Sequence, residues 1–175
     1  MNIRIVQNDI TALPVDAIVN AANCSLLGGG GVDGAIHAAA GAELLNVCRA
    51  LGGCDTGEAR ITPGFRLKAK FIIHTPGPVW QGGDNNEIEL LRSCYINSLQ
   101  LALLYKCRNI AFPCISTGVY NFPRDLAAEI ALTSSFQWRG LFPLDVVFCC
   151  FAQSDVEIYK TTCERLLIEY NETLP

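Results

Sequence analysis

The residues with the clearest potential for chemistry lie close together between Asn23 and His37. Four consecutive glycines, residues 28–31, allow unusual backbone angles, so several N–H groups can point at one anion such as a phosphate. Asp33 lies just beyond them, where a carboxylate would repel the anion unless it had a chemical role. Asp33 and His37 share one face of a predicted helix, because they are four residues apart. A capping aspartate beside a histidine is the simpler interpretation. We favour an acid–base carboxylate beside an imidazole, with Asn23 holding a water or a sugar hydroxyl.

The segments around these residues are typical of a strand and a helix. The apolar run Ala17 to Val19 predicts a buried strand, and residues 35–41 predict the first turns of a helix that continues to about Cys48. A second turn with glycine, residues 116–120, follows the predicted strand 109–115. Ligands of parallel sheets bind outside the carboxyl ends of the strands. Both loops should therefore lie on one rim, where they could grip a pyrophosphate from two sides.

The rest of the chain alternates between predicted strands and helices. Further strands are predicted at residues 3–6, 58–62, 71–74 and 144–151. Asn86 with Glu89, and Ser154 with Glu157, have the spacing of capping boxes at the starts of two helices. About six strands and four substantial helices predict an α/β fold with a mostly parallel sheet covered on both faces, in a single domain spanning residues 1–175.

Composition and charge restrict the compartment and the partners. Half of the 175 residues are hydrophobic, yet no apolar run is long enough to cross a membrane, and the first residues lack the features of a signal peptide. We therefore expect a cytoplasmic protein. The net charge of −4 gives no general attraction to nucleic acid or to an anionic membrane. No Lys or Arg occurs between Arg4 and Arg49, so backbone amides would have to hold the anion, which suits a small phosphorylated ligand.

The cysteines and the second histidine have structural interpretations. Nine cysteines, an odd number, argue against a disulfide framework, and their spacing lacks the pairs of a zinc ribbon. Five of them lie in apolar surroundings and are expected to be small buried hydrophobes: Cys94, Cys107, Cys114, Cys149 and Cys150. We expect His74 to be a core histidine with satisfied hydrogen bonds. No metal and no redox cofactor is expected.

Two alternatives remain open at this point. Gly29, Gly31 and Gly34 match the dinucleotide-binding pattern GxGxxG, which would indicate a nicotinamide-dependent oxidoreductase. The match is weak, because in that fold the first glycine directly follows the strand. Asp9 could bind the amino group of a ligand or begin a turn, and the turn is favoured.

Taken together, these motifs resemble those of the macrodomains, and in particular those of the MacroD type. The resemblance extends over VNAAN at residues 19–23, GGGGVDGAIHAAAG at 28–41, TGEARITPG at 56–64, HTPGPVW at 74–80 and ISTGVYNFP at 115–123. The spacing of Asn23 from Gly30-Gly31-Val32-Asp33 is similar to the catalytic signature of that family. The family usually has glycine where this chain has Asn8. The resemblance implies a three-layer α/β/α sandwich around a six-stranded mixed sheet.

The resemblance also implies an ADP-ribose site. Asn23 and Asp33 would act in catalysis, and His37 would support Asp33. The ligand would contact Asp9, Ile10, Ala22, Gly30, Gly31, Val32, Ser116, Thr117, Gly118, Val119, Tyr120 and Phe151. Of these, Asp9 and Ile10 would bind the adenine, and Phe151 would pack near it.

The implied activity is hydrolysis of esters at the distal ribose, without a cofactor. Its substrates would be O-acetyl-ADP-ribose and proteins that carry ADP-ribose on Asp or Glu side chains. The general base would be Asp33 or a substrate phosphate. A non-catalytic reader of ADP-ribose is the alternative in the same family. We expect a monomer that binds neither nucleic acid polymers nor membranes.

Overall fold

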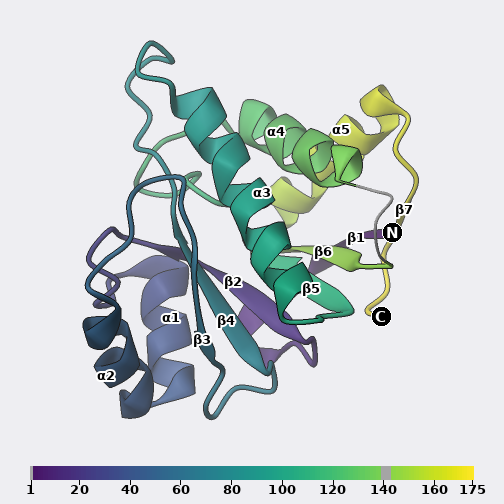
Figure 1. Ribbon diagram of the computed structural model, residues 1–175. Coiled ribbons are helices and arrows are strands. Elements are labelled where there is room, and N and C mark those ends of the chain that lie inside the picture. The colour runs from purple at the N-terminus through teal and green to yellow at the C-terminus, as the bar shows by residue number, and fades with distance from the viewer. Residues whose placement is uncertain (1, 139–142) are drawn as a thin grey trace.

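The computed structural model describes residues 2–138 and 143–175, which form a sheet between two layers of helices (Figure 1). The strand order is β3-β4-β2-β5-β6-β1-β7. The bounds are β1 Ile3–Gln7, β2 Ala17–Ala22, β3 Arg60–Pro63, β4 Phe71–Pro76, β5 Asn109–Phe112, β6 Asp145–Cys150 and β7 Tyr170–Asn171. Among these strands, β3 pairs antiparallel with β4, and the other pairings are parallel. The predicted α/β sandwich with a mixed sheet is confirmed. The two-residue β7, which pairs with β1, is a seventh strand that we did not predict.

The helices divide between the two faces of the sheet (Figure 1). Helices α1 (Gly31–Ala40) and α2 (Ala42–Leu51) cover one face, and α3 (Glu87–Leu104), α4 (Arg124–Gln137) and α5 (Gln153–Leu166) cover the other. Alternate strand residues supply a separate core on each side. Val146 and Phe148 belong to the core beneath α3–α5, whereas Val147 belongs to the core beneath α1 and α2.

The predicted helix over residues 33–48 is two helices. Gly41 separates them with φ +94° and ψ 174°, a conformation that a residue with a Cβ rarely adopts. Its N–H donates to the carbonyl of His37 and so ends α1. The apolar period continues through this break, because both helices pack on the same face of the sheet, and the periodicity alone does not reveal the turn.

Both predicted capping boxes are wrong. Asn86 does precede α3, but it has φ +62° and makes no capping hydrogen bond through its side chain. The buried Glu87 carboxylate instead accepts backbone N–H groups of the preceding loop, from Gln81, Gly83 and Asn85. Ser154 lies inside α5, which begins at Gln153 after Ala152. The tertiary path of each incoming loop, and not the local spacing, decides these helix starts.

The cysteines are free thiols, and most of them are buried. Four of the five cysteines expected in the core are buried, whereas Cys114 is only half-buried, because β5 ends at Phe112, earlier than predicted. In residues 2–138 and 143–175, no helix is long and apolar enough to cross a membrane.

Candidate ligand-binding and active site

A cavity of about 760 Å³ opens at the carboxyl ends of the parallel strands. Residues 29–33 and 116–120 line it from two sides, so the prediction that both loops share one rim of the sheet is confirmed. The other lining residues come from the ends of β1, β2, β4, β5 and β6 and from the adjoining helices. They are Asn8, Asp9, Ile10, Ala21, Ala22, Asn23, Ala35, Gly77, Pro113, Cys114, Cys149, Phe151 and Asp155.

The first loop presents the N-terminus of α1 to the cavity. Gly30 is the N-cap residue of this helix and makes no side-chain capping bond, so the helix start offers backbone amides and a partial positive charge to a ligand. No Lys or Arg is among the residues that line the cavity in the described part of the chain. An anion bound here would therefore be held by main-chain donors, as expected from the sequence.

The second loop depends on a close approach to Gly77. Ser116 has φ +65°, and its hydroxyl oxygen is buried without a hydrogen-bond partner among the described residues. A Cβ placed on Gly77 would lie 2.2 Å from that oxygen and 2.7 Å from Ile115. Only glycine leaves room for the loop to pack against the end of β4. The exposed Val119 stands at the tip of this loop.

Asp33 is buried, and its two carboxylate oxygens have different surroundings. Oδ1 accepts a hydrogen bond from Asn20 Nδ2 at 2.8 Å and lies 3.5 Å from His37 Nε2. Oδ2 faces the glycine loop, since a Cβ on Gly29 would lie 3.2 Å from it and 3.4 Å from Asn23 Nδ2. One oxygen is therefore anchored in the protein, and the other is near Asn23 at the cavity wall.

The loop itself fixes the amide of Asn23. Its Nδ2 donates to the carbonyl of Gly28 at 2.8 Å, and its Oδ1 accepts from the hydroxyl of Ser25. The side chain is half-buried and lines the cavity next to Asp33. Asn23 is therefore held at a set position relative to the carboxylate, which is what orientation of a water or a sugar hydroxyl requires.

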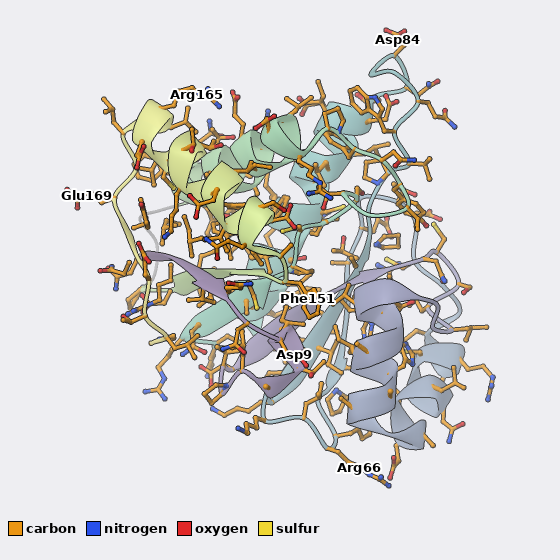
Figure 2. All side chains as sticks on the ribbon, turned by 180° about the vertical axis from the view of Figure 1, so that it is seen from behind. Asp9, Arg66, Asp84, Phe151, Arg165 and Glu169 are labelled. Carbon is orange, nitrogen blue, oxygen red and sulfur yellow. The ribbon has the colours of Figure 1, made fainter. Side chains whose placement is uncertain are left out.

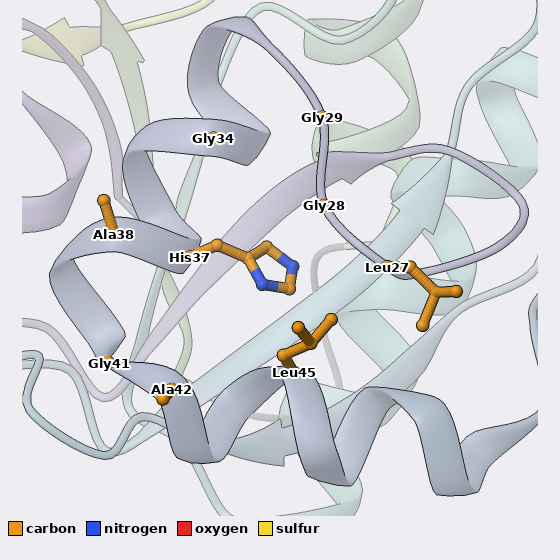
Figure 3. A pocket seen from close by; sticks show the side chains of 9 residues that line it. All are labelled: Leu27, Gly28, Gly29, Gly34, His37, Ala38, Gly41, Ala42 and Leu45. Atoms are coloured by element: carbon orange, nitrogen blue, oxygen red, sulfur yellow. The ribbon is translucent and has the colours of Figure 1, made fainter.

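His37 lies behind the glycine loop and not in the large cavity. Its ring lines a second hollow of about 390 Å³. Figure 3 shows the ring between Gly28 and Leu45 of α2. Its Nε2 is buried and has no hydrogen-bond partner within the described residues. The predicted pairing with Asp33 on one helix face is confirmed. The placement leaves His37 in contact with the carboxylate and away from the space that a ligand would fill.

An acidic and an aromatic residue, Asp9 and Phe151, are also among the residues that line the cavity (Figure 2). Asp9 caps the 3₁₀ helix η1 (Ile10–Ala12), because its Oδ1 accepts from the N–H and the hydroxyl of Thr11. The predicted turn is therefore present, and the exposed Asp9 also lines the cavity. Asn8, in place of the usual glycine, accepts the N–H of Asp9 at 2.8 Å. Phe151 is 84% exposed although its ring lines the cavity.

His74 is a core histidine with bonded ring nitrogens, as predicted. It is fully buried in β4; its Nδ1 lies 3.1 Å from Asn20 Nδ2 and its Nε2 lies 3.0 Å from the hydroxyl of Thr62. Burial, and secondarily the neighbouring His37, lower the pKa of His74 to about 3. The ring is therefore neutral at physiological pH.

We expect the buried His74 to weaken the fold in acid. The unfolded ring binds a proton below its ordinary pKa of about 6.5, whereas the folded ring does so only near 3. Stability from this residue is thus present above pH 6.5 and is lost as the pH falls, by ~1.4 kcal/mol per pH unit.

Urea unfolding of the wild-type protein and of His74→Asn between pH 7 and pH 4 measures this contribution. The difference between their free energies of unfolding should change by roughly that slope. His37 of α1 and Cys48 of α2 face the ring, and both are present in the two proteins. Parallel pH curves would contradict the lowered pKa.

Several residues in or beside the cavity had no functional role assigned from the sequence. Cys114 and Asp155 line the cavity because β5 ends early and α5 begins at its rim. In the sequence, Gly77 was recognised only as the middle residue of a Pro-Gly-Pro segment that ends a strand. Asn20 carried the best signal: it is a polar residue in an apolar strand, on the same strand face as Ile18, and that face packs beneath α1.

Comparison with known proteins defines the class. The Macro domain family profile matches residues 19–131. A macro domain-containing protein of Chlorobaculum tepidum is 59% identical over 162 residues, which cover 90% of this chain and 93% of that protein. An O-acetyl-ADP-ribose deacetylase of Salmonella newport is 53% identical over 97% of this chain and 96% of its own length.

A mutant of the Oceanobacillus iheyensis macrodomain, solved with ADPR, superposes with a TM-score of 0.88. It is 45% identical, over 94% of this chain and 93% of the other. The chain belongs to the Macro domain family.

The glycine loop also differs from a nicotinamide-binding loop. Residues 23–30 separate the end of β2 from the start of α1, whereas the dinucleotide pattern places its first glycine directly after the strand. The GxGxxG match at Gly29, Gly31 and Gly34 is therefore a coincidence of glycine content. It gives no support to an oxidoreductase.

Proposed function

We propose that this protein is an ADP-ribose-binding hydrolase that cleaves acyl esters of the distal ribose. Its substrates would be O-acetyl-ADP-ribose and proteins mono-ADP-ribosylated on Asp or Glu. The observation that carries the proposal is Asp33: a buried carboxylate with one oxygen anchored on Asn20 and the other at the wall of a cavity between two amide-rich loops. The deacetylase name of a relative that is 53% identical supports the same reaction class.

In the proposed complex, residues 30–32 and 116–120 hold the diphosphate through their backbone amides. The adenine lies at the opposite end, near Asp9, Ile10 and Phe151, and the distal ribose lies near Asn23. This orientation directs the ester toward Asp33. The cavity volume of about 760 Å³ and the absence of Lys and Arg among the described lining residues support it, because main-chain donors suit a small diphosphate.

The chemistry requires an activated water and a leaving alcohol. A water held by Asp33, Asn23 and the diphosphate would attack the ester carbonyl. Asp33 or a substrate phosphate would accept its proton. The bond between the acyl carbon and the ribose oxygen then breaks, and the group that took the proton from the water gives it to the ribose oxygen, which leaves as a hydroxyl. A positioned base contributes ~10²–10⁴-fold to such a reaction. No step requires a metal or a redox cofactor.

A side-by-side turnover assay tests the proposal. The purified protein should release acetate from O-acetyl-ADP-ribose and ADP-ribose from a glutamate-modified protein, and free ADP-ribose should inhibit both reactions competitively. Tight calorimetric binding of ADP-ribose with no cleavage of either ester would reject the hydrolase and leave a reader of ADP-ribose. Turnover of only one ester would identify the preferred substrate class.

The exposed ring of Phe151 provides a test of the ligand's orientation. Phe151→Ala should weaken ADP-ribose binding about 5- to 150-fold, because stacking of a base on an aromatic ring is worth ~1–3 kcal/mol. The melting temperature should stay unchanged, since the side chain is 84% exposed. Leu104→Ala, at another exposed apolar residue far along α3, is the matched control and should leave binding intact. Undiminished affinity in Phe151→Ala would place the adenine elsewhere.

A further inference from the structure

A chain of hydrogen-bonded, buried polar groups runs from Asp33 across three neighbouring strands, β2, β4 and β3. Asn20 of β2 and His74 of β4 are direct neighbours across two parallel strands, and both are fully buried. Asn20 Nδ2 lies 2.8 Å from Asp33 Oδ1 and 3.1 Å from His74 Nδ1. His74 Nε2 continues the chain to the hydroxyl of Thr62 on β3, at 3.0 Å. None of these groups beyond Asp33 lines the cavity.

The hydrogen bonds of this chain can run in only one direction. An ionised carboxylate accepts hydrogen bonds and donates none, so the atom of Asn20 that faces Asp33 must be the amide nitrogen. The second hydrogen of that nitrogen points to His74 Nδ1, which must then carry a lone pair. The proton of the neutral ring is therefore on Nε2 and goes to Thr62, whose own hydrogen is directed to the carbonyl of Pro63 at 3.2 Å.

The opposite tautomer would disturb the carboxylate. With a proton on Nδ1, two donors would face each other 3.1 Å apart between His74 and Asn20. A rotation of the Asn20 amide would relieve that contact, but it would place an amide oxygen against Asp33 Oδ1. Both arrangements leave buried groups in repulsive contact, which costs more than a lost hydrogen bond. The tautomer of His74 and the position of the Asp33 carboxylate are therefore coupled.

We propose that His74, held in its Nε2–H tautomer by Thr62, is a positioning residue that acts through Asn20 to aim Asp33 at the substrate ester. The inference rests on the proposed hydrolase function. Its consequence is that the turnover number depends on a residue that does not line the cavity. Binding of ADP-ribose does not depend on this residue, because the diphosphate loops are held by other contacts.

Two substitutions at His74 separate positioning from packing. In His74→Asn the new side-chain Oδ1 can replace Nδ1 as the acceptor for the Asn20 amide. The leucine of His74→Leu is branched like asparagine but has no hydrogen-bond acceptor. We expect His74→Leu to lower kcat for O-acetyl-ADP-ribose about 10- to 100-fold, as expected for a misplaced catalytic group. KM and the Kd for ADP-ribose should stay within about threefold of the wild-type values. His74→Asn should retain kcat within about threefold. Equal losses in both variants, or no loss in His74→Leu, would overturn the proposal.

A second pair of variants covers the case in which His74→Leu does not fold. Thr62→Val removes the acceptor that selects the tautomer, and Thr62→Ser keeps it. The valine variant should lose kcat while the serine variant retains it. Similar turnover in the two variants would contradict the role given to Thr62.

The tautomer itself can be measured without turnover. The chain contains two histidines, so the ring nitrogens of ¹⁵N-histidine-labelled protein give two sets of signals, which a His74→Asn sample assigns. We expect the wild-type His74 to show a protonated Nε2 and an unprotonated Nδ1 from pH 6 to pH 8. Thr62→Val should shift it toward a tautomer mixture. A protonated Nδ1 in the wild-type protein would overturn the inference even if the ester is hydrolysed. Absence of turnover with the expected tautomer would reject the proposed function instead.

Discussion

Asp33→Asn should lower the turnover of O-acetyl-ADP-ribose about 10²–10⁴-fold while ADP-ribose still binds. The amide has nearly the shape of the carboxylate but accepts no proton at neutral pH and carries no charge to orient a water. Its carbonyl oxygen can still accept the hydrogen bond from Asn20, so the local packing should persist. Initial rates at saturating substrate give kcat, and calorimetry with ADP-ribose gives the affinity of the same preparation.

The control for this prediction is Asp84→Asn. Asp84 lies on an exposed loop at the edge of the molecule, away from Asp9 and Phe151 (Figure 2), and does not line the cavity, so its loss of charge should change neither quantity. Wild-type kcat in Asp33→Asn would contradict the role of the carboxylate. It would leave the substrate phosphate and Asn23 to activate the water. A parallel loss of kcat and of affinity would indicate damage to the loop instead of a missing base.

Gly34→Ala should abolish most of the ADP-ribose affinity, with a rise in Kd of at least tenfold. A Cβ at this position would lie 2.5 Å from the backbone oxygen of Gly29, so the glycine loop must move away from α1. Intrinsic helix propensity favours alanine over glycine by ~1 kcal/mol, so a loss of ADP-ribose affinity cannot come from a weakened helix α1. The loop that would hold the diphosphate is the part that shifts. A tenfold change in Kd corresponds to about 1.4 kcal/mol.

Ala39→Gly is the matched control for the loop displacement. Ala39 is exposed in the same helix, and this substitution should lower stability by ~1 kcal/mol without touching the loop. Calorimetry should find its affinity for ADP-ribose unchanged once the protein is folded. If Gly34→Ala bound ADP-ribose as well as Ala39→Gly, the glycine loop would not form the diphosphate site.

Much of the site follows from local patterns that a single sequence displays. The glycines at 28–31 and the turn at 116–120 each follow an apolar strand pattern, and in a parallel sheet such loops share one rim. The four-residue spacing of Asp33 and His37 places them on one helix face wherever that helix packs. The absence of Lys and Arg between Arg4 and Arg49 already required main-chain donors for any anion. These features depend on backbone geometry and on short separations along the chain.

The tertiary structure decided the rest, because it depends on contacts between distant segments. The register of β2 against β4 brings Asn20 beside His74, and no local pattern contains that register. The packing of α2 places Leu45 in the same hollow as the ring of His37, which is separate from the large cavity. The need for Gly77 arises only from the approach of Ser116. The sequence alone thus determined the family, the fold class and the groups available for chemistry. The packing of strands and loops decided which oxygen of Asp33 is hydrogen-bonded to Asn20 and which faces the glycine loop, since burial and hydrogen bonding act between residues far apart in the chain.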